Sequence, residues 1–250
     1  MIYTISVNKK FDTLGGVIVF FDWTYLVLVM PAVIFSLWAS ARVNSTFKRY
    51  SAVRPASGMT GAEAARRVLD ANGLYNVRIE RISGNLTDHF DPRTNVIRLS
   101  DSVYGSSSTA AIGVAAHEAG HAVQYANGYV PLKLRNAIIP ATNLGSRLAM
   151  PLILLGILFS SMGSQFIYVA YAGIICFALS TLFQLLTLPT EFNASKRALS
   201  SIEGSGMLYG SELEGAKQVL SAAAMTYVAA LAVSIMQLLH LISIVGGRRK

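Results

Sequence analysis

Two histidines four residues apart, with a glutamate directly after the first, are the residues whose spacing most clearly allows chemistry. They are His117, Glu118 and His121, in the stretch from Ala115 to Gln124. On a helix, residues i and i+4 share one face. The two imidazoles can therefore bind one Zn²⁺, and Glu118 can take a proton from a zinc-bound water. The alternative is a buried helix whose histidines only form hydrogen bonds within the core.

The residues around this motif favour a helix. The Gly/Ser turn at 105–108 offers a serine N-cap, and Asn127 with Gly128 offers a C-cap. Between these ends, apolar residues recur at helical spacing. The sequence therefore predicts that both histidines lie on one helix.

A catalytic zinc site needs a third protein ligand and one open position. The other histidines are His89 and His240, and the one cysteine, Cys176, lies within an apolar run. Asn127 stands where an H-E-x-x-H-x-x-G-x-x-H site would have its third histidine. Glu191, which follows a long apolar segment, is therefore the strongest candidate. Its alternative is an ordinary charge at a membrane boundary.

The composition indicates a membrane protein. The chain is 53% hydrophobic and 14% charged, with a mean hydropathy of +0.47, whereas a soluble domain carries about 25% charged residues. The net charge of +8 is typical either of nucleic-acid binding or of the cytoplasmic loops of membrane proteins. Because the Lys and Arg residues lie beside the apolar runs, we expect a lipid bilayer and no nucleic acid as partner.

Uncharged apolar stretches predict about four transmembrane helices. Residues 23–41 carry no charge and are long enough as a helix to cross a bilayer core of about 30 Å. The uncharged segment 148–188 is interrupted at 160–165, which predicts two spans joined by a tight turn. The last span is rich in alanine and contains His240, for which an interhelical hydrogen bond is the expected role.

We therefore expect a mostly α membrane protein with a small α+β catalytic domain inserted between the first and second transmembrane helices. Residues 131–147, which mix cations with apolar side chains, are expected to form an interfacial helix before the second span. The expected divisions are an N-terminal segment at 1–22, transmembrane helix 1 at 23–41, the catalytic domain at 42–148, a transmembrane hairpin at 149–188, a third-ligand helix and connector at 189–224, transmembrane helix 4 at 225–247 and a basic tail at 248–250.

Within the catalytic domain, three short elements are expected before the histidine motif. Residues 60–73 predict an amphipathic helix that opens with a capping box. Residues 76–82 alternate apolar and charged side chains, which predicts a half-buried strand, and residues 86–100 predict a hairpin. An extended peptide can dock on such a strand edge by strand addition. His89 lies there, either as a substrate or oxyanion contact or as a solvated histidine beside the turn.

Five stretches of the chain carry a resemblance to a known family. They are Phe21–Tyr25, Gly58–Glu63, Leu86–Arg93, Ala116–Gln124 and Thr190–Ser195. Through them, and over nearly its whole length, the chain resembles the YugP-type membrane-bound neutral zinc metallopeptidases. It is more distantly similar to the gluzincin fold of the membrane proteases that process CAAX proteins.

The resemblance implies a zincin-like catalytic domain and peptide-bond hydrolysis. His117, His121 and Glu191 would bind one Zn²⁺ per chain, and Glu118 would be the base. The wider pattern contains E-x-x-A-D, whereas this chain has Ser195 where that pattern has Asp. Because a serine can still hydrogen-bond a ligand histidine, Ser195 is a candidate for orienting one of them.

The expected substrates are peptides or proteins, including membrane-associated ones, and the expected nucleophile is a zinc-activated water. His89, Tyr104 and Arg197 are candidates for contacting the substrate or the oxyanion. One alternative is an intramembrane zinc protease, which the nearby charges of Asp101 and Arg135 disfavour. The other is a non-catalytic membrane scaffold with a structural zinc, which would use the same ligands.

The distribution of basic residues predicts the orientation in the membrane. Four spans place residues 42–148 and 189–224 on one side, and these hold 16 of the 21 Lys and Arg residues. The positive-inside rule then puts the catalytic face in the cytoplasm, in a multi-pass protein of a bacterial cell membrane. The basic tail at 248–250 argues for the opposite orientation. The sequence determines neither the natural substrate nor the oligomeric state.

Overall fold

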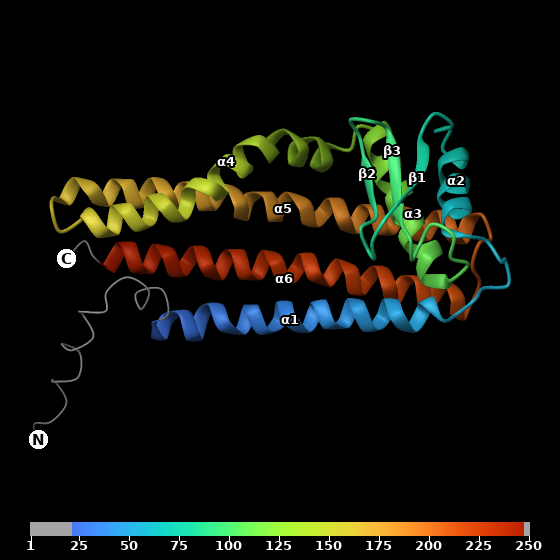
Figure 1. The fold of residues 1–250 in the computed structure, drawn as a ribbon, viewed down its shortest axis with the longest axis horizontal. Helices are drawn as coiled ribbons and strands as arrows, with labels where there is room; N and C mark the ends of the chain where they lie inside the picture. The colour runs from blue at the N-terminus through green and yellow to red at the C-terminus, as the bar shows by residue number, and fades with distance from the viewer. Residues whose placement is uncertain (1–21, 248–250) are drawn as a thin grey trace, which may run out of the picture.

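Four long helices dominate the structure, a computed structural model that describes residues 22–247. They lie roughly side by side along the long axis, with a small domain at one end (Figure 1). Each is long and apolar enough to cross a membrane, so the predicted mostly α fold with four candidate spans is confirmed. The basic tail 248–250 and the N-terminal segment, apart from Asp22, lie outside the described residues. The four helices are α1 Trp23–Ser51, α4 Val130–Phe159, α5 Ile167–Gly204 and α6 Ser211–Gly247.

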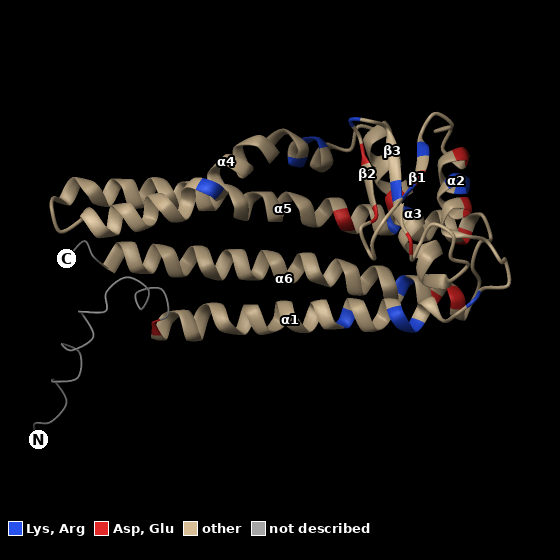
Figure 2. Cartoon of the chain, viewed as in Figure 1, with Lys and Arg blue, Asp and Glu red and all other residues tan. Residues whose placement is uncertain are grey.

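Charged residues gather at the end of the molecule that carries the small domain (Figure 2). The other half of the helices is free of Lys, Arg, Asp and Glu from residue 23 to 41, from 148 to 190 and from 218 to 247. Large apolar side chains such as Leu37, Leu158 and Ile175 are more than half exposed there. An exposed apolar surface of this extent fits a lipid bilayer, so this half is the candidate membrane-spanning part of the chain.

The predicted hairpin is formed by α4 and α5, which pack against each other through small residues. The chain turns at residues 160–163, and the short 3₁₀ helix η2, Ser164–Phe166, leads into α5. A Cβ atom on Gly173 would lie 2.7 Å from the carbonyl oxygen of Ala149, and one on Gly145 would lie 2.9 Å from that of Cys176. Glycine at these positions lets the two backbones approach closely, as is common between transmembrane helices.

The long helices continue past the ends that the apolar segments predict. Helix α1 extends beyond residue 41 to Ser51, and α5 passes through Pro189 to Gly204. The expected interfacial helix at 131–147 is the first half of α4. The reason is that apolar length reports only the part of a helix in lipid, whereas the backbone hydrogen bonds continue into the polar region. The division of the chain into domains stays a prediction.

The small domain contains the elements that the sequence predicts before the histidine motif. Helix α2, Gly61–Ala71, opens with a capping box in which Thr60 and Glu63 bond each other's backbone N–H groups. In the three-stranded sheet the order is β1-β3-β2, with β1 parallel and β2 antiparallel to β3, so β2 lies at an edge. The strands are β1 Arg78–Ile82, β2 His89–Asp91 and β3 Val96–Ser100.

The turn between β2 and β3 is held by Asp91. Its carboxylate accepts hydrogen bonds from the hydroxyl of Thr94 at 2.7 Å and from the backbone N–H of Arg93 at 2.9 Å. These bonds favour the ionised form and lower the pKa of Asp91 to about 2. The predicted hairpin is therefore confirmed, and its register is fixed by this turn.

One apolar core joins the small domain to the ends of the long helices. Helix α3, Thr109–Ala126, is buried along most of its length at the centre of this core. Packed around it are side chains from α2, β3, α5 and α6, which include Leu69, Ile97, Ile202 and Val219. The position of α3 relative to α5 and α6 is therefore set by close packing.

At the far end of the molecule, His240 links α6 to α1. Its ring is fully buried, and Nε2 lies 3.0 Å from Oδ1 of Asp22, the N-cap of α1. The interhelical hydrogen bond predicted for His240 is confirmed.

Candidate metal centre

Helix α3 presents both motif histidines to α5. The helix begins after Ser108, whose side chain accepts a hydrogen bond from the backbone N–H of Ala111. Gly120 lies between the histidines on the face that meets α5, where a Cβ would lie 2.7 Å from the carbonyl oxygen of Ala194. The absence of a side chain at Gly120 therefore lets α3 approach α5 closely enough for His117 and His121 to reach it.

Glu191 of α5 meets the two histidines. Its Oε2 lies 3.2 Å from Nε2 of His117 and 3.5 Å from Nε2 of His121. One ligand atom from each of the three residues lies within 4.8 Å of the others. Two ligands bound about 2.05 Å from a tetrahedral Zn²⁺ are about 3.3 Å apart. The observed separations and the donor set, two imidazole nitrogens and a carboxylate oxygen, therefore fit Zn²⁺.

The second nitrogen of each histidine is held by a neutral side chain. Nδ1 of His117 lies 3.1 Å from Oγ of Ser195, and Nδ1 of His121 lies 3.0 Å from Oε1 of Gln124. Because Oε1 can only accept, Nδ1 of His121 donates this hydrogen bond, and Nε2 is the nitrogen that faces Glu191 and can bind a metal. Such partners orient metal-binding imidazoles. Ser195 therefore lies where it can orient a histidine, while sequence reasoning missed Gln124.

Gln124 also ties the centre to α5. It is fully buried, and its Nε2 donates to the carbonyl oxygen of Thr190 at 2.8 Å and to Oδ1 of Asn193 at 3.0 Å. These bonds determine which end of the amide faces His121. One side chain thus fixes both the His121 ring and the helix turn that carries Glu191.

The second oxygen of Glu191 faces a cation. Oε1 lies 3.6 Å from a terminal guanidinium nitrogen of Arg135, a residue of α4. The guanidinium also lies over the ring of Phe183, and its Nε is buried with no hydrogen-bond partner among the described residues. Because Glu191 is only 3% exposed, this ion pair helps to keep its carboxylate charged. Sequence reasoning placed Arg135 beside the motif but gave it no role in the site.

The carboxylates of Glu118 and Glu191 make the electrostatic potential at the centre negative. Burial by itself lowers the pKa of His121, but the hydrogen bond and charge of Glu191 together with the charge of Glu118 outweigh burial and raise it. The same charges attract a divalent cation. Glu118 lies beside the three ligand atoms and lines the hollows on both sides of them.

An open cleft of about 560 Å³ leads to the three residues. Its floor is α3, one wall is the β2–β3 hairpin with Asp88 and His89, and the other wall is α4 with Arg135 and Ile139. Tyr227 of α6 also lines this cleft, beside Glu191. Sequence reasoning missed Tyr227, for which the only signal was that it is the one tyrosine between residues 218 and 247.

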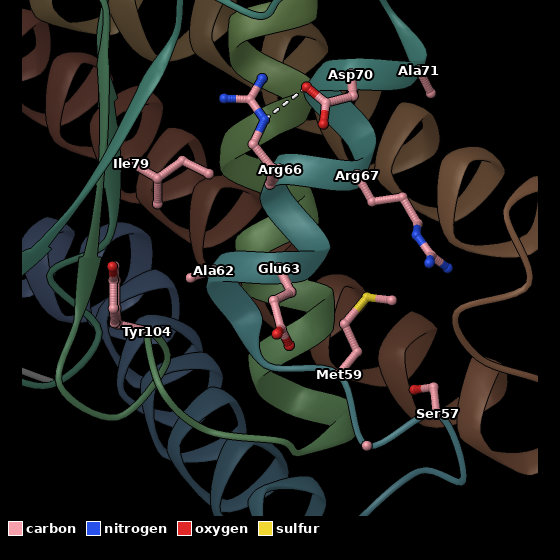
Figure 3. Close-up of a pocket in the computed structure, with 11 residues that line it drawn as sticks. Ser57, Met59, Ala62, Glu63, Arg66, Arg67, Asp70, Ala71, Ile79 and Tyr104 are labelled. Carbon is pink, nitrogen blue, oxygen red and sulfur yellow. Dashed lines mark hydrogen bonds and ion pairs between the residues drawn. The ribbon is translucent and has the colours of Figure 1, made fainter.

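Two of the residues that the sequence singles out lie elsewhere. Tyr104 lines a hollow beside α2, near the ion pair of Arg66 and Asp70 (Figure 3). Arg197 lines a different hollow, between α3 and α5, and donates from Nε to Oδ1 of Asn193 at 2.8 Å. Arg197 follows Glu191 by six residues, which turns it about 240° around the helix. The structure therefore brings His89, but neither Tyr104 nor Arg197, to the cleft.

The four candidate spans and the cluster of His117, His121 and Glu191 define a membrane protein with a candidate metal site. Residues 25–246 match the protein family described as "Putative neutral zinc metallopeptidase", and the chain belongs to this family. It is 47% identical over 225 residues to the "Putative membrane protease YugP" of Bacillus subtilis (strain 168). The aligned region covers 90% of this chain and 98% of that protein. No solved structure matches the chain.

Enlarging Gly120 is expected to weaken metal binding. The added methyl group of Gly120→Ala meets the backbone of α5, so α3 must move away and carry its histidines from Glu191. Disturbing ligand orientation costs about 10- to 100-fold in metal affinity, measurable by competition with a chromogenic zinc chelator. Gly113→Ala is the matched control on the same helix, because its Cβ would make an ordinary 3.4 Å contact with Ala216. Equal zinc affinity in both variants would contradict this account.

Proposed function

We propose that this chain is a zinc-dependent endopeptidase of the membrane, with one Zn²⁺ bound by His117, His121 and Glu191. The observation that carries the proposal is that three ligand atoms lie within 4.8 Å of one another at the floor of an open cleft. Three protein ligands leave one coordination position for water, as in catalytic zinc sites. The family to which the chain belongs supports the same reaction class.

Glu118 is the proposed general base. Zinc bound at this centre supplies Lewis acidity and lowers the pKa of a bound water towards about 7. Glu118, next to the first ligand histidine and facing the cleft, would accept the proton of the attacking water. It later delivers the proton to the leaving amine when the peptide bond breaks.

The substrate is proposed to bind as an extended strand. Strand β2 lies at an edge of the sheet and forms one wall of the cleft. The unpaired side of β2 offers backbone N–H and C=O groups to a peptide that lies along it. His89, on β2, is in place to contact such a peptide. A peptide bound in this way would place its scissile bond beside Glu118. Because the cleft is open, the peptide can extend beyond the site in both directions, as an endopeptidase requires.

Tyr227 is the proposed donor to the oxyanion. Its phenol lies next to Glu191 and lines both hollows that meet at Glu118. A phenolic O–H there can donate to the oxygen that becomes negative as water attacks the carbonyl. Tyr104 and Arg197 line other hollows, and His89 is the second candidate for this role.

The catalytic face is proposed to be cytoplasmic. The small domain and the polar ends of the four helices lie together at one end of the molecule, with most of the basic residues (Figure 2). Basic residues are retained on the cytoplasmic side of membranes. Peptides in the cytoplasm, or segments that emerge from the inner leaflet, are then the accessible substrates.

Glu118→Gln is expected to abolish cleavage without loss of metal. The amide keeps the shape of the side chain but cannot accept the proton, and general-base catalysis contributes about 10²- to 10⁴-fold. Zinc content and cleavage of an unfolded peptide pool are measured on detergent-solubilised protein. If Glu118→Gln cleaved peptides as fast as wild type, Glu118 would not be the general base. A zinc-loaded wild type that cleaves nothing would favour the structural-zinc scaffold.

Tyr227→Phe is expected to lower kcat by about 10²- to 10³-fold, as loss of one oxyanion donor does elsewhere. The effect on KM should be small, because the hydroxyl acts mainly in the transition state. Tyr104→Phe is the matched control, since it removes the same hydroxyl from a hollow away from the zinc ligands. A normal kcat in Tyr227→Phe would exclude the phenol from catalysis.

The orientation can be tested with single cysteines in a Cys176→Ser background. Ser57 is exposed in the small domain and Ser161 is exposed at the opposite turn of the α4–α5 hairpin. With a membrane-impermeant maleimide on intact cells, we expect Ser161→Cys to be labelled and Ser57→Cys to be labelled only after lysis. The reverse pattern would place the catalytic face outside.

A further inference from the structure

A second hollow opens beside Glu118, on the side of α1 and α6. Its volume is about 240 Å³, and it shares His117, Glu118 and Glu191 with the open cleft. The two hollows therefore meet at the atoms where the proposed reaction takes place. The remaining wall of the second hollow is largely apolar, and its apolar members are Val43, Leu86, Val114, Leu220, Ala223 and Ala224.

Three polar side chains that line this hollow, those of Thr226, Ser195 and Asp88, already have hydrogen-bond partners within the protein. The hydroxyl of Thr226 donates to the carbonyl oxygen of Ala223 at 2.6 Å, and Ser195 is bonded to His117. The carboxylate of Asp88 accepts from the backbone N–H of Ser100 at 2.7 Å. A polar side chain that entered the hollow would lose its water and find few groups free to bond it, which is unfavourable. An apolar side chain has no such cost.

The size of the hollow comes from two alanines of α6. Ala223 and Ala224 face it where larger residues would fill the space between α1, α3 and α6. The volume of about 240 Å³ is several times the 30 Å³ or so that one water occupies in the liquid. It is large enough for the side chain of Leu, Met or Phe, and too small for a further length of folded chain.

We propose that this hollow is a specificity subsite that takes an apolar side chain of medium size, on one of the two residues that flank the scissile bond. The inference rests on the proposed peptidase function. A peptide that lies along β2 in the open cleft passes Glu118, so the side chain of one flanking residue points into the hollow. Burial of that side chain holds the scissile carbonyl against the zinc and Glu118.

The test uses zinc-loaded, detergent-solubilised full-length protein and two probes. The first is a peptide pool in which the cleaved positions are mapped by mass spectrometry. The second is a set of peptide hydroxamates with Leu, Ala or Asp next to the zinc-binding group, whose binding is measured by calorimetry. For wild type we expect a preference for Leu over Ala and Asp of at least about 10-fold in both measurements, as for apolar pockets in general.

Ala224→Phe fills the hollow and is expected to shift both preferences from Leu towards Ala, while the zinc content stays unchanged. Ala223→Met is a second filling variant, in case Ala224→Phe does not fold. Met225→Phe is the matched control, because Met225 is a neighbour on α6 that does not line the hollow. It should keep the preference of wild type.

The outcomes separate the subsite from the peptidase. Cleavage by wild type with equal rates at Leu, Ala and Asp would overturn the subsite and leave the peptidase standing. Hydroxamate selectivity for Leu that Ala224→Phe removes, with no cleavage of any peptide, would support the subsite and overturn the peptidase. Preferences that neither filling variant changes would also overturn the subsite.

Discussion

The buried carboxylate of Glu191 is the group on which the rest of the arrangement depends. An isolated charge in such an environment costs several kcal/mol, and α5 holds this one almost completely out of solvent. One oxygen faces His117 and His121, and the other faces Arg135. A divalent cation bound between the two imidazoles and Glu191, as proposed, would balance this negative charge more closely than Arg135 does at 3.6 Å. The buried carboxylate of Glu191 therefore favours the binding of a cation between it and the two histidines, which is where the proposed reaction needs a metal ion.

The site is assembled because the long helices continue beyond their apolar stretches. Helix α5 is continuous from the apolar end to Gly204, so it carries Glu191 just beyond the segment without charges. Helix α3 packs against it through Gly120, and α6 adds Tyr227 from the other side. The centre thus lies just past the uncharged stretch of α5, at the start of the polar half of the molecule.

Much of this could be predicted from the sequence, because the signals involved are local. The spacing of His117 and His121 identifies a helix face, and the apolar segments identify the spans. Glu191 could be selected because so few other ligands are available. The capping box of α2 and the turn at Asp91 are also local features, and the structure has both.

The remaining features depend on packing between distant segments and carry no local signal. Arg135 and Tyr227 reach the centre only because α4 and α6 pack against α5, and Gln124 meets Thr190 and Asn193 only because α3 does. Arg197 is near Glu191 in sequence, but helix geometry directs it to another hollow, and Tyr104 lies in the turn after β3 and lines a hollow beside α2. The ends of the long helices were also missed, because hydropathy reports lipid contact and not helical hydrogen bonding.

X-ray absorption at the zinc edge of the purified protein tests the central claim most directly. The account predicts one zinc per chain with two imidazole nitrogens at about 2.0–2.1 Å and carboxylate and water oxygens at about 2.0–2.2 Å, and no sulfur. In Glu191→Ala the imidazole signal should persist with one oxygen fewer. A zinc-free protein, or a zinc whose ligands are unchanged by Glu191→Ala, would contradict it.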